Sequence, residues 1–154
     1  MRVLVFVLVL VLAHRADADV TGGVFGAVGY ETRDGIAGGG GLELGIRRDR
    51  VSVVVGVRVL AIHGTTGNTA LVEVPLVVGY AVTPVVRVDV GLGLGFGPST
   101  GGGDFIHFPD TSFLVAAGAG YAFTPHLEAR IFSMTEIGGS ANFVGILAGP
   151  ALVF

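Results

Sequence analysis

The 154-residue sequence is 51 % hydrophobic, has a mean hydropathy of +0.78 and carries a formal net charge of −3. It contains no Cys, which excludes disulfides, thiol catalysis and thiolate metal sites. The mildly acidic balance lacks the basic footprint of nucleic-acid binding, so no nucleic-acid partner is expected. Beyond the N-terminal segment there is no uninterrupted run of about 18 apolar residues, so no transmembrane helix is predicted, although the chain is unusually apolar for a soluble domain.

The N-terminal residues have the features of a signal peptide. Arg2 supplies a short positive region, and residues 3–13 form an apolar run that is shorter than the roughly 20 residues a membrane-spanning helix needs. Residues 16–18 (Ala-Asp-Ala) match an Ala-x-Ala cleavage site, so we expect cleavage after Ala18. An uncleaved anchor is the alternative, which the short apolar run disfavours. The expected organisation is a signal peptide at 1–18 and a mature domain at 19–154.

Short strands with a two-residue period are predicted along the whole mature chain. The pattern is clearest at residues 86–97, where Val, Leu and Phe alternate with Gly, Arg87 and Asp89, so that one face is apolar and the other is small or charged. Eight strands are predicted, at residues 23–32, 36–47, 50–62, 70–82, 86–97, 113–123, 127–135 and 143–154. This pattern predicts an all-β, eight-stranded antiparallel up-and-down transmembrane β-barrel, because lipid then meets the apolar face and the closed sheet pairs every backbone polar group.

The connections between the strands are of two kinds. Short turns are predicted at residues 48–49, 83–85 and 124–126. The other connections are a tight one at 33–35 and longer Gly-, Ser- and Thr-rich ones at 63–69, 98–112 and 136–142. Because such barrels keep short turns on the periplasmic side, we place the three short turns there and the other four connections outside the cell.

The predicted inward face carries charges of both signs. These residues are Glu43, Arg58, Glu73, Arg87, Asp89, Glu128 and Arg130. Buried charges must be paired, and eight strands leave little free bore, so the favoured interpretation is a structural salt-bridge network in the lumen. A gated path for protons or ions is the alternative.

An internal repeat supports construction from hairpins. Residues 79–84 (Gly-Tyr-Ala-Val-Thr-Pro) recur as residues 120–125 (Gly-Tyr-Ala-Phe-Thr-Pro), and the chain ends on Phe154. These features resemble the eight-stranded outer-membrane β-barrel family, which includes the OmpA-type transmembrane domain and opacity-like proteins. The resemblance implies export to the bacterial outer membrane, contact with its lipid, and recognition of the C-terminal strand through Phe154 by the assembly machinery. Leu152 departs from the family pattern, in which the third-from-last residue is usually aromatic.

No group of residues predicts catalysis. The glycine runs lack the following helix and the fixed frame that a phosphate site needs. His63, His107 and His126 lie in three different connections without ligand spacing, so no metal site is expected. A lipid-modifying barrel enzyme would need a His and Ser pair with a Glu nearby, and His126 has Glu128 close in sequence but no matching Ser. We therefore predict no catalytic residue, no cofactor and no metal.

The connection at 98–112 is the candidate contact surface. Phe105, Ile106 and Phe108, with His107 between them, are unusually apolar for a loop expected to meet water, and exposed apolar clusters often mark interaction sites. Folding of these side chains over the barrel mouth is an equal alternative. The predicted function is a structural or surface-interaction role through the external loops, with an unidentified cell-surface or envelope partner. The alternatives are a narrow pore for ions or small solutes and, least supported, a lipid-modifying enzyme.

Overall fold

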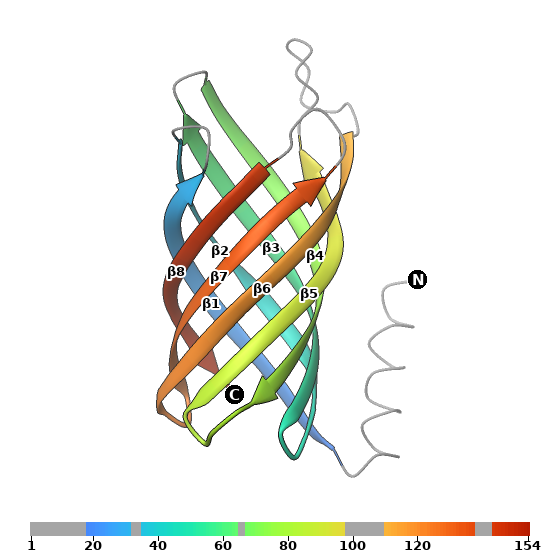
Figure 1. Cartoon of the computed structure of the whole chain (residues 1–154), viewed down its shortest axis with the longest axis vertical. Helices are drawn as coiled ribbons and strands as arrows, with labels where there is room; N and C mark the ends of the chain where they lie inside the picture. Colours follow the sequence, from blue (N-terminus) through green and yellow to red (C-terminus); the bar gives the residue numbers. More distant parts are fainter. Residues whose placement is uncertain (1–17, 32–34, 65–66, 98–109, 138–142) are drawn as a thin grey trace.

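The computed structural model describes residues 18–31, 35–64, 67–97, 110–137 and 143–154, which form a closed antiparallel barrel (Figure 1). Its strands are β1 (Asp19–Glu31), β2 (Gly35–Arg48), β3 (Val51–Gly64), β4 (Gly67–Ala81), β5 (Val86–Gly97), β6 (Asp110–Thr124), β7 (Leu127–Ile137) and β8 (Phe143–Val153). Each strand pairs with the next one in the chain, and β1 pairs with β8 to close the sheet. The predicted eight-stranded up-and-down barrel is therefore confirmed.

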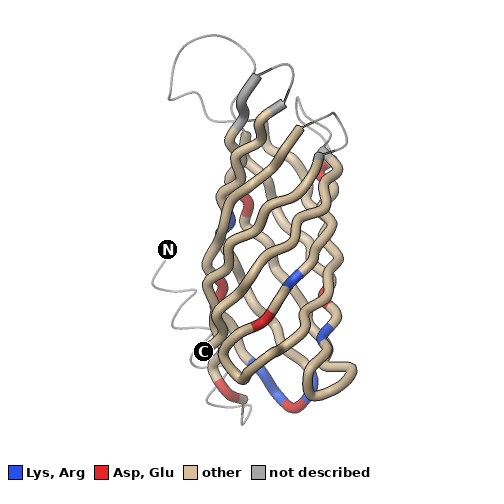
Figure 2. The backbone as a smooth tube through the Cα atoms, turned by 90° about the vertical axis from the view of Figure 1, so that its left-hand side faces the viewer, with Lys and Arg blue, Asp and Glu red and all other residues tan. Residues whose placement is uncertain are grey.

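Side chains alternate between the outside of the barrel and its lumen. On β5, Val88, Val90 and Leu92 are exposed on the outside, whereas Gly91 and Gly95 are buried on the lumen side. Charged residues occupy few points along the barrel wall (Figure 2). The strands have 11 to 15 residues, which is enough for each to cross a bilayer when tilted. No helix in the described residues is long and apolar enough to span a membrane.

The start of β1 and the end of β8 lie at the same end of the barrel as the short turns (Figure 1). We call this the periplasmic end, because barrels of this kind keep their short turns on the periplasmic side, and the opposite end the outer end. The tightest turn joins β2 to β3, where Asp49 adopts a φ of 52°. Asp tolerates this left-handed conformation better than most residues, which suits it to a turn of this length.

Threonine hydroxyls hold both turns of the repeated motif. The Thr83 Oγ1 accepts hydrogen bonds from the backbone N–H groups of Val85 (3.3 Å) and Val86 (3.0 Å). Thr124 Oγ1 accepts the equivalent bonds from the second and third residues after it. The sequence predicted a three-residue turn after Phe123. Instead, Thr124 itself pairs with Leu127 through a register shift, because its hydroxyl tightens the end of the hairpin.

The strands at the outer end are longer than the sequence predicted. β3 and β4 leave only residues 65–66 between them, so most of the connection expected at residues 63–69 is strand. β6 begins at Asp110 and β7 continues to Ile137. In a closed barrel the neighbouring strands supply the backbone partners, so Gly- and Thr-rich segments of low strand propensity are still held in the ladder. This extension brings two residues expected in loops, Ser112 and Glu136, onto the lumen face.

Candidate functional site

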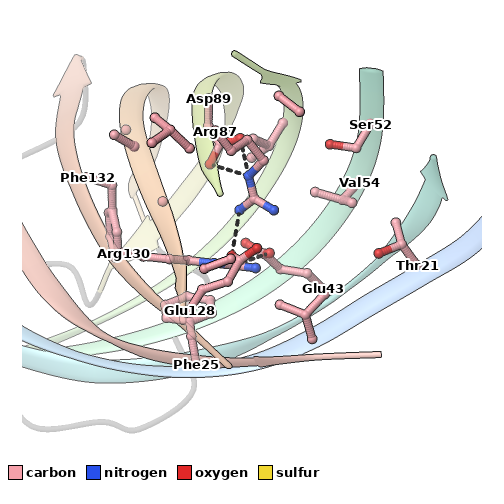
Figure 3. A pocket seen from close by; sticks show the side chains of 18 of the residues that line it. Thr21, Phe25, Glu43, Ser52, Val54, Arg87, Asp89, Glu128, Arg130 and Phe132 are labelled. Carbon is pink, nitrogen blue, oxygen red and sulfur yellow. Dashed lines mark hydrogen bonds and ion pairs between the residues drawn. The ribbon is translucent and has the colours of Figure 1, made fainter. Parts of the chain in front are cut away.

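The periplasmic half of the lumen contains a cavity of about 70 Å³. The lining residues include Arg47 near the end of β2, Arg50 and Pro84 in the turns, and Phe25 and Arg58. Strands from all sides contribute to the wall, and several charged side chains lie close together within it (Figure 3). The predicted inward charges among the lining residues are Glu43, Arg58, Arg87, Asp89, Glu128 and Arg130.

Glu43 on β2 lies at the centre of the ion-pair network. Its Oε2 is 2.6 Å from Nη1 of Arg130 on β7, and its Oε1 is 3.3 Å from Nη2 of Arg58 on β3. All three side chains are less than a tenth exposed. Each Glu43 oxygen thus meets one guanidinium, which offsets the cost of removing the carboxylate from water.

Arg87 on β5 extends the network across the cavity to Glu128 on β7. Its Nε is 2.8 Å from Asp89 Oδ1, and its Nη2 is 3.4 Å from Glu128 Oε2 (Figure 3). The same Glu128 oxygen is 3.0 Å from Nε of Arg130, which leads back to Glu43. Six of the seven predicted charges are therefore joined, with three arginines matched to three carboxylates. Because each carboxylate faces a guanidinium, the network neutralises charge within the lumen.

Two aromatic rings hold Arg58 in place. The guanidinium carbon lies 4.9 Å from the Phe132 ring centroid and 5.4 Å from that of Phe25, within the range of cation–π attraction. The two rings pack edge to face, 5.7 Å apart at an interplanar angle of 87°. Arg58 is 5 % exposed, and no described group accepts a hydrogen bond from its Nε or Nη1.

An apolar layer fills the lumen beyond this cavity. Leu60, Leu114, Met134 and Leu147 come from four different strands and are all 0 % exposed. Ala37 and Leu71 belong to the same packed cluster. None of these six side chains lines the cavity. The cavity therefore opens at the periplasmic end and is closed by packed side chains towards the outer end.

Glu73, the seventh predicted charge, lies apart from the ion pairs. It is 0 % exposed, and no described donor reaches either of its carboxylate oxygens. Its neighbours include Glu136 on β7, which sequence reasoning assigned to an external connection. Glu136 is 2 % exposed and accepts a 2.8 Å hydrogen bond from the Ser112 hydroxyl. The missed signal was the two-residue period of β7, which places Glu136 in phase with Glu128 and Arg130.

The two histidines that the structure describes, His63 and His126, lie far apart. His63 lies near the outer end of β3, whereas His126 lies in the periplasmic turn between β6 and β7. His126 Nδ1 is 3.1 Å from the backbone oxygen of Val153, which ties that turn to the last strand. The described residues contain no group of three or more His, Asp or Glu side chains that could hold a metal ion.

The remaining predicted site residues lie on the outside of the barrel or beyond the part that the structure describes. Phe154 is 69 % exposed beside the end of β8. The candidate loop contacts Phe105, Ile106, His107 and Phe108 lie outside the described residues, as do residues 1–17 of the predicted signal peptide.

Solved structures of bacterial outer-membrane barrels are similar to the chain. The N-terminal β-barrel domain of Pseudomonas aeruginosa OprF matches with a TM-score of 0.70 and 16 % identity, covering 89 % of this chain and 99 % of that one. Ail, the attachment invasion locus protein of Yersinia pestis, matches with a TM-score of 0.59 and 13 % identity, covering 89 % and 97 %. Neisserial surface protein A matches with a TM-score of 0.56 and 16 % identity, covering 87 % and 94 %.

These structural similarities show the fold, and the sequence comparison shows the family. A search of curated proteins found no match to the chain. Residues 9–135 match the family described as "Outer membrane protein beta-barrel domain", which is most of the chain. Together with the lipid-facing apolar exterior, this match places the protein in the bacterial outer membrane. The chain belongs to the outer membrane protein beta-barrel domain family.

Proposed function

We propose that the protein is a non-catalytic outer-membrane barrel that acts through its external connections. One observation carries the proposal: the lumen is closed towards the outer end by the packed layer of Leu60, Leu114, Met134 and Leu147. A lumen filled in this way offers no path for solutes, so we expect the protein to contact its partners through its outer surface. The paired charges of the periplasmic half then serve to fill and neutralise the lumen.

The connection between β5 and β6 has the composition expected of the contact site. Residues 98–109 contain Phe105, Ile106 and Phe108 but only one formal charge, Asp104. Such a segment favours an apolar protein surface as partner over a polyanion, which would require clustered Arg or Lys. The names of two similar structures, an attachment invasion locus protein and a surface protein, support a surface role without defining its partner.

The experiment is an adherence assay on cells that display the barrel. Residues 101–108 are replaced by a Gly/Ser linker, and adherence to epithelial monolayers and self-aggregation of the displaying cells are measured. The matched control replaces residues 138–142 (Gly-Gly-Ser-Ala-Asn), an external connection without large apolar residues. We expect both variants to fold and only the first to lose adherence. Equal adherence of both variants and wild type, or no adherence by wild type, would overturn the proposal.

Two parts of this proposal concern how the protein reaches the membrane. Residues 1–18 direct export and are removed, so the N-terminal sequence of the purified protein should begin at Asp19. The C-terminal strand, ending on exposed Phe154, engages the assembly machinery. Phe154→Ala should therefore lower the amount of folded barrel in the outer membrane more than it lowers refolding yield in detergent. An intact N-terminus, or equal losses in the two settings, would contradict these assignments.

The charged cavity favours a second candidate function, a narrow pore for ions or small solutes. The cavity opens at the periplasmic end and is lined by Arg47, Arg50 and the ion-pair network. A pore would require the apolar layer to move aside. Conductance measurements separate the two candidates, because the first predicts a barrel that does not conduct.

A further inference from the structure

The outer half of the lumen contains two carboxyl groups that take no part in the ion pairs of the described residues. Glu73 comes from β4 and Glu136 from β7, and both are almost completely buried, at 0 % and 2 % exposed. Glu73 lies opposite Gly95 in the β4–β5 ladder, and a Cβ at Gly95 would collide with the Glu136 carboxyl group, so the two acidic side chains occupy neighbouring positions in the lumen. The three arginines of the ion-pair network are already matched to Glu43, Asp89 and Glu128. Two buried acidic groups therefore remain without a guanidinium of their own.

Hydrogen bonding leaves the same two groups incompletely satisfied. The Ser112 hydroxyl donates to Glu136 Oε2 at 2.8 Å, but no described donor reaches Glu136 Oε1 or either oxygen of Glu73. Arg58 lies opposite Glu73 in the β3–β4 ladder, yet its ion pair is with Glu43. A buried carboxylate with no partner is strongly unfavourable, because water no longer solvates the charge.

Residues on β3, β5 and β6 lie around the two carboxyl groups. Facing Glu73, β3 contributes the charge of Arg58 and β7 that of Glu136. β6 contributes Ser112, and β5 contributes Gly95, where a Cβ would collide with Glu136 Oε1 and Ser112 Oγ. Gly95 thus leaves the space that the Glu136 carboxyl group occupies. The apolar layer of Leu60, Leu114, Met134 and Leu147 packs in the same half of the lumen.

Two ionised carboxylates are both acceptors, so neither can donate a hydrogen bond to the other. A proton on one of them removes one buried charge and supplies the missing donor, as in other sites where two carboxyl groups share a proton. We propose that Glu73 and Glu136 form a proton-binding site that holds one shared proton at neutral pH. The bond is an O–H···O hydrogen bond between the two carboxyl groups, and the pair then carries one negative charge, facing Arg58.

This site goes beyond the surface role proposed above and does not depend on it. The shared proton helps to keep water out of the outer half of the lumen, because a singly charged, hydrogen-bonded pair attracts less water than two neighbouring carboxylates. Loss of the proton would leave two like charges close together, which favours entry of water into the outer half.

The test is infrared spectroscopy of the folded barrel in lipid bilayers at pH 7, with the carbonyl stretch of a protonated carboxyl group as the signal. Wild type should show this band, and uniform labelling of glutamate with carbon-13 should shift it. Glu73→Gln and Glu136→Gln should each abolish the band, whereas Glu128→Gln, in the ion-pair network, should leave it. Ser112→Ala should keep the band but move its frequency, because Glu136 loses a donor.

The result is decisive even if one variant fails to fold, because wild type and its labelled form are measured first. No protonated-carboxyl band in wild type, or a band that survives both glutamine substitutions, would overturn the proposal. A band that appears only after treatment with a chelator would overturn it in favour of a bound metal cation. Folding of each variant is checked by the change of gel mobility on heating.

Discussion

Gly22 on β1 and Phe154, directly after β8, exchange backbone hydrogen bonds and so help to join the first and last strands at the periplasmic end. The Gly22 N–H donates to the Phe154 carbonyl at 2.8 Å, and the Phe154 N–H donates to the Gly22 carbonyl at 3.0 Å. The Phe154 ring lies over Gly22, so that a Cβ at this position would be 2.8 Å from the ring carbon Cε2. The absence of a side chain at Gly22 therefore allows the C-terminal aromatic residue to cover the seam between β1 and β8.

Gly22→Val should destabilise the closed barrel by about 1–3 kcal/mol, the usual cost of forcing extra atoms into a packed contact. Gly26→Val is the matched control, because Gly26 lies on the same face of β1 and a Cβ there would come no closer than 3.9 Å, to the backbone oxygen of Gly39. Urea unfolding in detergent micelles measures both variants. A Gly26→Val barrel as destabilised as Gly22→Val would contradict the role of the ring contact.

Arg130→Ala should cost about 3–5 kcal/mol, because it leaves Glu43 and Glu128 buried with fewer partners. Arg48→Ala, an exposed residue at the periplasmic turn, should change stability by less than about 0.5 kcal/mol. The midpoint of the gel-mobility change on heating reports both effects. Equal midpoints for the two variants would show that the ion pairs do not stabilise the barrel.

Thr83→Val should weaken the turn between β4 and β5 by about 1 kcal/mol, because two backbone N–H groups lose their acceptor. Thr83→Ser keeps the hydroxyl and should retain most of the stability. Hydrogen exchange of the Val85 and Val86 amides provides the local measurement. If these amides exchange at the same rate in Thr83→Val as in wild type, the hydroxyl is not the acceptor that holds the turn.

The double variant Leu60→Ala, Leu147→Ala should open a path through the apolar layer, since each substitution removes a fully buried side chain. We expect each change to cost about 2–5 kcal/mol and the folded double variant to conduct ions. The control, Val90→Ala with Leu92→Ala, removes similar volume from the lipid face. A folded double variant without conductance would place the barrier elsewhere in the lumen.

The lipid-facing pattern was predictable from the sequence because it depends only on a two-residue period. In β5, the alternation of Val and Leu with Gly and charge defines both faces without knowledge of any other strand. The repeated Thr-Pro turns could be predicted for the same reason, since their hydrogen bonds join residues two or three positions apart. The outer ends were mispredicted where Gly, Ser and Thr mark loops in isolation but remain paired in a closed sheet.

The partners within the lumen could not be predicted, because they depend on the stagger of strands around the barrel. Arg130 and Glu43 are 87 positions apart and meet only because β7 and β2 project side chains to the same level. β7 extends to Ile137, two residues beyond the predicted end. This extension places Glu136 on the lumen face, and so the acidic pair with Glu73 could not be predicted. Sequence patterns assign residues to the lumen, but only the closed geometry shows which of them touch.

The closed lumen is the central claim, and single-channel recording in planar bilayers tests it most directly. The folded wild-type barrel should give no discrete conductance steps at neutral pH, because packed leucine and methionine side chains separate the periplasmic cavity from the outer end. Discrete steps from the purified barrel that change amplitude in Arg87→Ala would contradict this account and make the protein a pore.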